Sequence, residues 1–501
     1  MPDPKKNSYD LCVIGSGPGG FAGAMRAFDA GKHVCLIEND QMGGTGVYWG
    51  ALSSKTMWEL AKDFYVAAKV DRGYRASGLV VDYQAMRSSV IQAVKEKQYQ
   101  MLSQVESFSP RRWEGPGSIT LKRGLGAFLD SNRVEVRLHD GTVETVSAEH
   151  ILIATGSRPR DFPGIEVDGE RILSSDHILN LREFPRRLMI IGAGIIGCEY
   201  SAIFSNFGQT KVYLADYAER IIPYEDEDIS DFVSGKLREN GVVIFQTAIL
   251  QDIVKQAEHL EVILDFADGR SEVVEVDAVL ISIGRTPNIA TLNLDNIGVE
   301  PNERGVLSTD ENLRVKGNIY ACGDVTHHPN LVNLAEMEGR FAVKHMYGKT
   351  QHRLNYDNMS TVMFFRPAVA AVGLNEKGCQ KRQIPYRVAS YSNSLVSRAI
   401  AMRATDGFAK IIVSDDEEQR ILGMRAAGPM ASNNIMTIAL LMDHSGGLTD
   451  ALKTVHPHPT MSEGIQECLR VLLDKSIFKS KAFPEQIKLR RWSPIGGDSD
   501  L

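Results

Sequence analysis

Residues 9–20 have the sequence YDLCVIGSGPGG, an apolar run that ends in a GxGxxG pattern. An alanine-rich helical stretch follows, and a second apolar run then ends in an acid. In such a unit the first glycine makes the tight turn, the second lets backbone approach a pyrophosphate, and the third lets helix and strand pack. The phosphates lie at the helix N-terminus, and the acid binds a ribose hydroxyl. The stretch predicts a dinucleotide site that uses Gly15, Gly17, Gly20 and Glu38.

A second unit of the same kind follows later in the chain, where an apolar run leads into Gly192, Gly194 and Gly197. Its second strand-like run ends in Asp216. A carboxylate there accepts hydrogen bonds from ribose hydroxyls and repels a 2′-phosphate. No arginine replaces it, although Arg220 is close in sequence, so we expect NAD(H) to be preferred over NADP(H). Two fingerprints predict two nucleotide sites, but the pattern alone does not assign a nucleotide to each site.

Composition indicates a globular enzyme. The 501 residues are too many for one core, which predicts several domains. The net charge of -7 offers no basic surface to nucleic acid or anionic membrane, and no apolar run is long enough to span a bilayer. Six scattered cysteines without CxxC or metal-ligand spacing are typical of buried thiols in a reducing cytoplasm. The first strand starts near residue 11, which leaves no room for a signal peptide. We expect a cytoplasmic protein with no nucleic-acid, membrane or metal partner.

Residues 43–55 have the sequence GGTGVYWGALSSK. This sequence resembles the active-site helix of the flavin-dependent disulfide reductases, the family of dihydrolipoamide dehydrogenase and glutathione reductase. The family pattern is Gly-Gly-Thr-Cys, four residues, Cys, two residues and then Ser-Lys. Gly46 and Ala51 stand at the two cysteine positions, so a disulfide cannot form there. The chain therefore resembles a disulfide reductase whose disulfide has been removed.

The resemblance assigns residues to two cofactors. It implies that the first fingerprint holds FAD and the second holds NAD(H). Lys55 would lie near the reactive nitrogen of the flavin and pair with Glu199, where its positive charge would tune hydride transfer. Other short motifs match the family's flavin-binding segments and its return from the NAD domain. The residues that these motifs place at the cofactors are Gly44, Thr45, Thr155, Gly156, Gly284, Asp324 and Ala335.

The resemblance also implies a domain organisation. Residues 1–160 and 285–355 would form a discontinuous FAD-binding domain, with residues 161–284 inserted as the NAD-binding domain. Residues 356–480 resemble the family's interface domain, which makes the enzyme a homodimer. Residues 481–501 would be a mobile C-terminal tail. The expected fold class is α/β, with two Rossmann-like dinucleotide-binding domains and a C-terminal α+β dimerisation domain.

Residues 456–463 have the sequence HPHPTMSE, which resembles the family's C-terminal catalytic signature. By that match His458 is the acid/base and Glu463 orients it. An imidazole titrates near neutral pH, and a carboxylate on its other nitrogen fixes the tautomer. In the family this pair reaches across the dimer interface into the partner's site. The competing interpretation is that His458 only caps the helix that starts near Ser462.

Together these features predict an FAD-dependent NAD(H) oxidoreductase without a redox disulfide. Hydride from NADH would pass through the flavin directly to a small-molecule acceptor such as a quinone or an activated alkene, with the His–Glu pair as proton relay. Gly46 and Ala51 would leave room for this acceptor at the flavin. Tyr48 and Trp49 either line an aromatic slot for a flat acceptor or pack in the core.

Two other functions remain open from the sequence. One is a soluble pyridine nucleotide transhydrogenase, because those enzymes carry a similar Trp-Gly followed by Ser-Lys, as Trp49-Gly50 and Ser54-Lys55 do here. The other is a catalytically degenerate flavin-binding subunit or scaffold, which would hold FAD without turning over.

Overall fold

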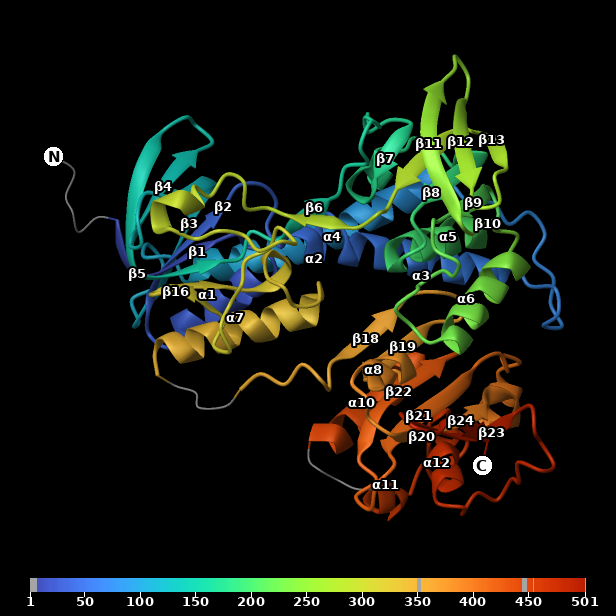
Figure 1. The fold of residues 1–501 in the computed structure, drawn as a ribbon. Coiled ribbons are helices and arrows are strands. Elements are labelled where there is room, and N and C mark those ends of the chain that lie inside the picture. Colours follow the sequence, from blue (N-terminus) through green and yellow to red (C-terminus); the bar gives the residue numbers. More distant parts are fainter. Residues whose placement is uncertain (1–6, 349–352, 444–447, 454, 501) are drawn as a thin grey trace. The chain divides into compact units, whose positions relative to one another are not determined.

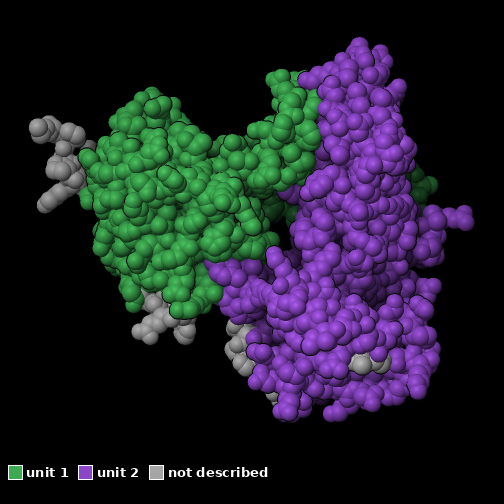
Figure 2. Space-filling model, viewed as in Figure 1, with its two compact units in different colours: residues 1–60, 76–184, 281–354 green, residues 61–75, 185–280, 355–501 purple. Residues whose placement is uncertain are grey.

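The computed structural model describes residues 7–348, 353–443, 448–453 and 455–500. The chain forms two compact units, each assembled from separate stretches of sequence (Figure 2). Unit 1 comprises residues 1–60, 76–184 and 281–354, and unit 2 comprises residues 61–75, 185–280 and 355–501. Among the described helices, none is both long and apolar enough to cross a membrane.

The first fingerprint folds within unit 1 as β1 (Ser8–Ile14), α1 (Pro18–Asp29) and β2 (His33–Glu38). β1 and β2 are parallel neighbours, and their central residues are fully buried, as expected for strands covered on both faces. Pro18 begins α1, where the missing backbone N–H costs nothing and the fixed φ suits the helix. The predicted order of strand, turn, helix and strand is confirmed.

The sheet of unit 1 contains strands from distant parts of the sequence. β1 and β2 are joined by β3 (Ser118–Phe128), β4 (Arg133–Leu138), β5 (Val143–Ile153), β16 (Arg314–Lys316) and β17 (Ile319–Ala321). β5 pairs in parallel with both β1 and β17, so strands from either side of residues 185–280 share one sheet. α7 (Val332–Met346) packs against α1 (Figure 1).

Unit 1 contains further helices and short strands outside this sheet. They are α2 (Gly44–Val47), α4 (Tyr83–Ser107), β6 (Ser157–Pro159), β7 (Ile172–Ser174), η1 (Ser175–Asn180), β15 (Arg285–Pro287), η2 (Leu294–Ile297) and η3 (Gly323–Val325). α3 (Ala51–Ala67) begins in unit 1 and ends in unit 2. The residues between α3 and α4 form no helix, and Gly73 and Gly78 both adopt positive φ there.

Unit 2 contains the second fingerprint, folded as β8 (Arg187–Ile191), α5 (Ile195–Phe207) and β9 (Lys211–Ala215). These strands lie in a sheet with the order β10-β9-β8-β14, formed with β10 (Val243–Phe245) and β14 (Ala278–Ile281). α6 (Glu227–Glu239) precedes β10 in the chain. A separate antiparallel sheet contains β11 (Ala248–Lys255), β12 (Leu260–Phe266) and β13 (Ser271–Val276).

The C-terminal part of unit 2 is an α+β domain with an antiparallel sheet. Its strands are, in spatial order, β18 (Ser360–Met363), β19 (Val369–Gly373), β22 (Ile421–Ala427), β21 (Phe408–Ser414), β20 (Tyr386–Ser392), β23 (Ile487–Ser493) and β24 (Gly497–Asp500). The helices are α8 (Glu376–Lys381), η4 (Asn393–Leu395), α9 (Ser397–Ala401), α10 (Ala431–Asp443), α11 (Leu448–Lys453) and α12 (Ser462–Leu472). α10 packs on β19 and β22, while α12 packs on β20 and β21. The predicted fold class is confirmed.

The expectation of a mobile C-terminal tail is wrong. β23 pairs antiparallel with β20, and β24 pairs with β23, so residues 487–500 extend the sheet. Ile487 is buried, Trp492 stacks on Tyr386 with 5.6 Å between ring centroids, and Arg490 bonds Glu376. The segment's basic and Gly-Pro-rich composition hid this strand, because its apolar partners lie about a hundred residues earlier in the sequence.

Candidate functional site

The first fingerprint forms a turn that only glycine fits. A Cβ at Gly15, whose φ is +103°, would lie 2.3 Å from the carbonyl oxygen of Ala154. A Cβ at Gly20 would lie 1.9 Å from the oxygen of Gly15. A Cβ at Gly17 would meet nothing within 4 Å, so space is open beside the turn. Steric crowding explains Gly15 and Gly20. The open space beside Gly17 fits a pyrophosphate at the start of α1.

Glu38 fixes the loop of this fingerprint. Its Oε2 accepts hydrogen bonds from the backbone N–H of Ser16 at 2.8 Å and from the Ser16 hydroxyl at 2.5 Å. Its Oε1 accepts one from the N–H of Asp40 at 2.7 Å. A carboxylate offers about four lone-pair positions, so one remains for a ribose hydroxyl. The acid therefore holds the turn rigid as well as standing where a nucleotide ribose is expected.

The second flavin motif converges on Arg285. Its Nε donates to the Ser157 hydroxyl at 2.7 Å, and its Nη2 donates to the Ser157 carbonyl at 2.7 Å and to Thr45 Oγ1 at 3.2 Å. The Ser157 hydroxyl in turn donates to Asp324 Oδ2 at 2.5 Å. Thr45 and Asp324, which the sequence assigns to the cofactor, are thus brought together by two residues that it missed. The signal for Arg285 was its place directly after Gly284 in a motif already noted.

The remaining flavin-motif residues also lie in unit 1. Thr155 Oγ1 is buried and has no hydrogen-bond partner within the described residues, which suits a site completed by a ligand. Gly156 adopts φ +67°, and Gly284 adopts φ +114°. Ala335 is buried on α7 beside Gly323, since a Cβ at Gly323 would lie 3.2 Å from its methyl carbon. Gly44 lies against Gly17.

The second fingerprint repeats the geometry of the first. Gly192 adopts φ +102°, Gly194 precedes α5 with open space around it, and Gly197 is buried within α5. Asp216 Oδ2 accepts from the N–H of Ala193 at 2.5 Å, and its Oδ1 accepts from the N–H of Ala218 at 2.8 Å.

Arg220, the nearest cation in sequence, pairs elsewhere. Its guanidinium forms ion pairs with Glu227 and Asp231 at the start of α6. A guanidinium held by two carboxylates has less positive charge to offer a 2′-phosphate. This arrangement agrees with the predicted preference for NAD(H).

His458 and Glu463 form a hydrogen-bonded pair in unit 2, with Nδ1 and Oε1 2.7 Å apart. The other carboxylate oxygen accepts from the N–H of Thr460 at 3.0 Å. Partial burial alone would raise the pKa of Glu463, but the hydrogen bonds with His458 and Thr460 hold that pKa below its usual value. The side chain of His458 is 67% exposed. Among the described residues, the His458 side chain bonds Glu463 rather than a backbone N–H at the start of α12, so it does not cap that helix.

Lys55 and Glu199 belong to different compact units, so their pairing stays a prediction. The Nζ atom of Lys55, on α3, lies 3.4 Å from the hydroxyl of Ser54. Glu199 is buried on α5, and its Oε1 accepts a hydrogen bond from the N–H of Phe364 at 2.9 Å.

Residues 43–50 leave less room than the sequence suggests. A Cβ at Gly46 would lie 2.4 Å from Cγ of Pro18, so the volume that a cysteine side chain would need is already filled. Tyr48 packs against the core of unit 1, and the indole N–H of Trp49 donates to Asp40 at 2.7 Å. The expectation that Gly46 and Ala51 leave room for an acceptor stays a prediction, and core packing explains Tyr48.

All six cysteines are free and buried. Cys12 and Cys35 are paired in register on β1 and β2, and the hydrogen bond between them, together with burial, raises the pKa of the Cys12 thiol. Burial also raises the pKa of Cys198 and Cys322 and lifts that of Cys379 to about 12. A reactive thiol needs a lowered pKa and solvent access, so these cysteines do not fit the role of a thiol relay.

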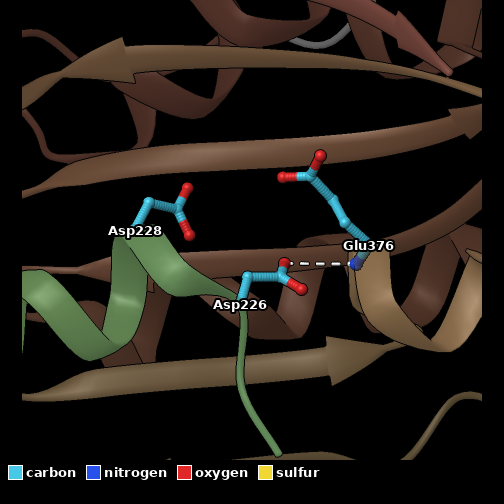
Figure 3. A group of neighbouring side chains, drawn as sticks. All are labelled: Asp226, Asp228 and Glu376. Carbon is cyan, nitrogen blue, oxygen red and sulfur yellow. Dashed lines mark hydrogen bonds between the residues drawn. The ribbon is translucent and has the colours of Figure 1, made fainter. Parts of the chain in front are cut away.

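One acidic group in unit 2 surrounds a lysine. Three carboxylates converge there (Figure 3): Asp226 directly precedes α6, Asp228 lies on α6 and Glu376 lies on α8. Lys410 Nζ, on β21, lies 2.8, 2.7 and 3.0 Å from them in that order. We assign this group to an internal ion network rather than to a ligand site.

The structure combines two dinucleotide-binding folds with acidic strand ends and a C-terminal α+β domain, which is the architecture of an oxidoreductase that uses two nucleotide cofactors. The sequence model of the pyridine nucleotide-disulphide oxidoreductases matches residues 9–339, and that of their dimerisation domain matches residues 359–469. The chain belongs to the pyridine nucleotide-disulphide oxidoreductase family. The family typically binds FAD and NAD(P)H, and the dimerisation domain implies a homodimer.

Individual relatives place the chain near dihydrolipoyl dehydrogenases. It is 33% identical to dihydrolipoyl dehydrogenase of Chlamydia pneumoniae over 460 residues, 91% of this chain and 95% of the relative. LpdA from Mycobacterium tuberculosis has a similar structure, with a TM-score of 0.84 and 25% identity over 92% of this chain and 99% of that chain. The Cu(II) complex of RclA, an HOCl-induced flavoprotein disulfide reductase from Escherichia coli, has a TM-score of 0.81 and 26% identity over 93% and 100%.

Proposed function

We propose that the protein oxidises NADH with bound FAD and reduces a small molecule other than a disulfide, such as a quinone or an activated alkene. The observation that carries the proposal is the contrast between six buried thiols and an exposed, carboxylate-bound His458. The chain retains a group suited to proton delivery, but residues 43–55 contain no cysteine for that group to serve.

The residues of the two fingerprints fit the cofactors of this proposal. In unit 1, FAD would be held by the open turn at Gly17, by Glu38, by the unpartnered hydroxyl of Thr155 and by Asp324 with Arg285. In unit 2, the turn at Gly194 and the carboxylate of Asp216 would hold NAD(H). When bound, FAD supplies a two-electron carrier between the nicotinamide and the acceptor.

The protein's own contribution to the reaction would be proton transfer by His458. With the Nδ1–H of His458 donating to Glu463, the Nε2 atom is left to exchange a proton with an acceptor. His458 lies in the stretch matched to the dimerisation domain, and its side chain is largely exposed. We therefore propose that His458 serves the active site of the partner subunit, so that each site is completed across the dimer.

Anaerobic reduction of the holoprotein by NADH tests the proposal. We expect the flavin absorption to bleach in one phase, without a long-wavelength thiolate–flavin charge-transfer band. Quinones, enones, lipoamide, glutathione disulfide, NADP⁺ and a thio-analogue of NAD are then supplied one at a time. Fast reoxidation by a quinone or enone supports the proposal, whereas a charge-transfer band with lipoamide turnover overturns it.

The same experiment separates the two alternatives. A transhydrogenase would be reoxidised fastest by the thio-analogue or by NADP⁺. Use of NADP⁺ would go against the preference for NAD(H) that Asp216 and the paired Arg220 indicate. A degenerate subunit would hold FAD that NADH does not reduce.

A further inference from the structure

His328 and Glu338 form a buried pair next to the turn that carries Asp324. Glu338 lies on α7 and is fully buried, with 0% of its side chain exposed. Its Oε1 lies 2.7 Å from Nδ1 of His328, whose side chain is 14% exposed. Its Oε2 accepts a hydrogen bond from the backbone N–H of Gly323 at 2.7 Å. Both carboxylate oxygens therefore contact the segment 323–328.

That segment is held at both backbone polar groups of Gly323, its N–H and its carbonyl. Gly323 adopts φ +73°, which leaves its N–H directed at Glu338. Its carbonyl accepts a hydrogen bond from the Thr326 hydroxyl at 2.9 Å. Thr326 Oγ1 also lies 3.3 Å from Nδ1 of His328. Asp324, between these anchors, then reaches Ser157 and the Arg285 cluster.

α7 places Glu338 with little freedom, because the helix touches the first fingerprint at the next residue. A Cβ at Gly339 would lie 2.1 Å from the carbonyl oxygen of Gly19 on α1. Such close packing of two helices leaves the carboxylate fixed relative to both flavin motifs. A buried charge is stable only when paired and hydrogen-bonded, and His328 and the Gly323 N–H provide these partners.

We propose that Glu338 and His328 act as positioning residues, holding the Gly323–Asp324 turn in the geometry that binds FAD. The inference rests on the proposed use of FAD in unit 1. It predicts that the pair affects the rate of FAD release and the spectrum of bound FAD. It also predicts that Glu338 acts chiefly as the hydrogen-bond acceptor for the N–H of Gly323.

The test compares holoprotein variants by their rate of FAD release, followed as the rise in free-flavin fluorescence, and by the visible absorption and circular dichroism of bound FAD. Glu338→Leu should release FAD about tenfold faster or more, which corresponds to about 1.4 kcal/mol. Glu338→Gln keeps an oxygen that can accept from Gly323 and should restore most of the retention and the wild-type spectrum. His328→Leu removes the partner without touching Gly323 and should release FAD about threefold faster, with a smaller effect in the Glu338→Gln background.

Glu225→Gln is the matched control, because Glu225 forms a buried ion pair with Arg425 at 2.9 Å in unit 2. This variant should change unfolding but not FAD release. The inference is overturned if Glu338→Leu and His328→Leu hold FAD as wild type does, or if the control releases FAD equally fast. Should Glu338→Leu fail to fold, His328→Leu alone decides between these outcomes. A wild-type protein that binds no FAD would instead refute the proposed function.

Discussion

Glu38 and Asp216 occupy equivalent places in two separate units. Each ends the second strand of a fingerprint, and each accepts backbone N–H groups from the glycine turn of its own unit. If such a side chain also binds the ribose, as we propose, it cannot be changed in one role alone. A substitution that tests nucleotide choice must therefore keep the acceptor for the turn.

Asp216→Asn meets this requirement, since an amide oxygen can still accept from the N–H of Ala193. The loss of negative charge should weaken NADH binding by about 1–2 kcal/mol and lower the discrimination against NADPH by about tenfold. Steady-state kcat/KM for both nucleotides measures the change, and FAD content should stay at the wild-type level. An unchanged NADH to NADPH ratio would contradict the assignment of Asp216 to the ribose.

Gly46 is predicted to tolerate no side chain while Pro18 is present. Gly46→Ala should lower the free energy of unfolding by about 1–3 kcal/mol, because its Cβ would overlap the proline ring. Pro18→Ala removes the overlapping carbon, so the double variant Pro18→Ala/Gly46→Ala should be more stable than the sum of the two single changes predicts. Urea unfolding of the four proteins provides the measurement. Additive effects would show that the two residues do not touch.

At the scale of elements, the lysine-centred network ties α6 to the C-terminal sheet within unit 2. Lys410 on β21 meets Asp226 and Asp228 at the start of α6 and Glu376 on α8, and Arg490 on β23 adds a second cation to Glu376. Burial alone would raise the pKa of Asp226, but the Lys410 ammonium outweighs burial and holds that pKa below its usual value.

Lys410→Met should destabilise the protein by about 3–5 kcal/mol, because several carboxylates lose the cation at their centre. Since the pKa of Asp226 is depressed in the fold, its contribution is fully present above the unfolded value near 3.8 and is lost as pH falls through the lowered value. Urea unfolding between pH 7 and pH 3 should show the two proteins converging in stability toward the acid end. Arg491→Met, which breaks a half-exposed pair with Asp415, is the control and should cost less than about 1 kcal/mol.

β23 covers β20, which would otherwise be an edge strand. A chain that ends at Gln486 should lose roughly 2–4 kcal/mol from the burial of Ile487 and the stacking of Trp492. It should also self-associate at high concentration, because β20 would present unpaired N–H and C=O groups. Thermal unfolding and sedimentation measure both effects. A chain that ends at Ser493 loses only β24, whose residues are all exposed, and should behave almost as the full chain does.

At the scale of the whole molecule, a shared site can be tested by complementation. If His458 serves the partner subunit's site, His458→Ala and Lys55→Met should each abolish NADH turnover as homodimers. Co-expressed, they should recover about a quarter of wild-type activity, because about half of the dimers are mixed and each mixed dimer has one intact site.

The control pairs His458→Ala with Glu463→Gln. Both changes damage the same proton relay, so no mixed dimer has an intact site and activity should not return. No recovery in the first mixture would place the relay within its own subunit. Recovery in the control would contradict the assignment of His458 and Glu463 to one relay.

The sequence by itself determined the two dinucleotide folds, and its resemblance to a family predicted the α+β domain and the His458–Glu463 pair. The two folds depend on short-range rules, a glycine turn and an acid at the end of the next strand, while the domain and the pair were recognised from their likeness to family motifs. Only the tertiary structure decided the meeting of Arg285 with Thr45, the contact of Gly46 with Pro18, the lysine-centred network and the strand at the C-terminus. These contacts join residues tens to hundreds of positions apart. Composition and local spacing carry no information about which residues so far apart in sequence meet in space, because the packing of strands and helices decides this.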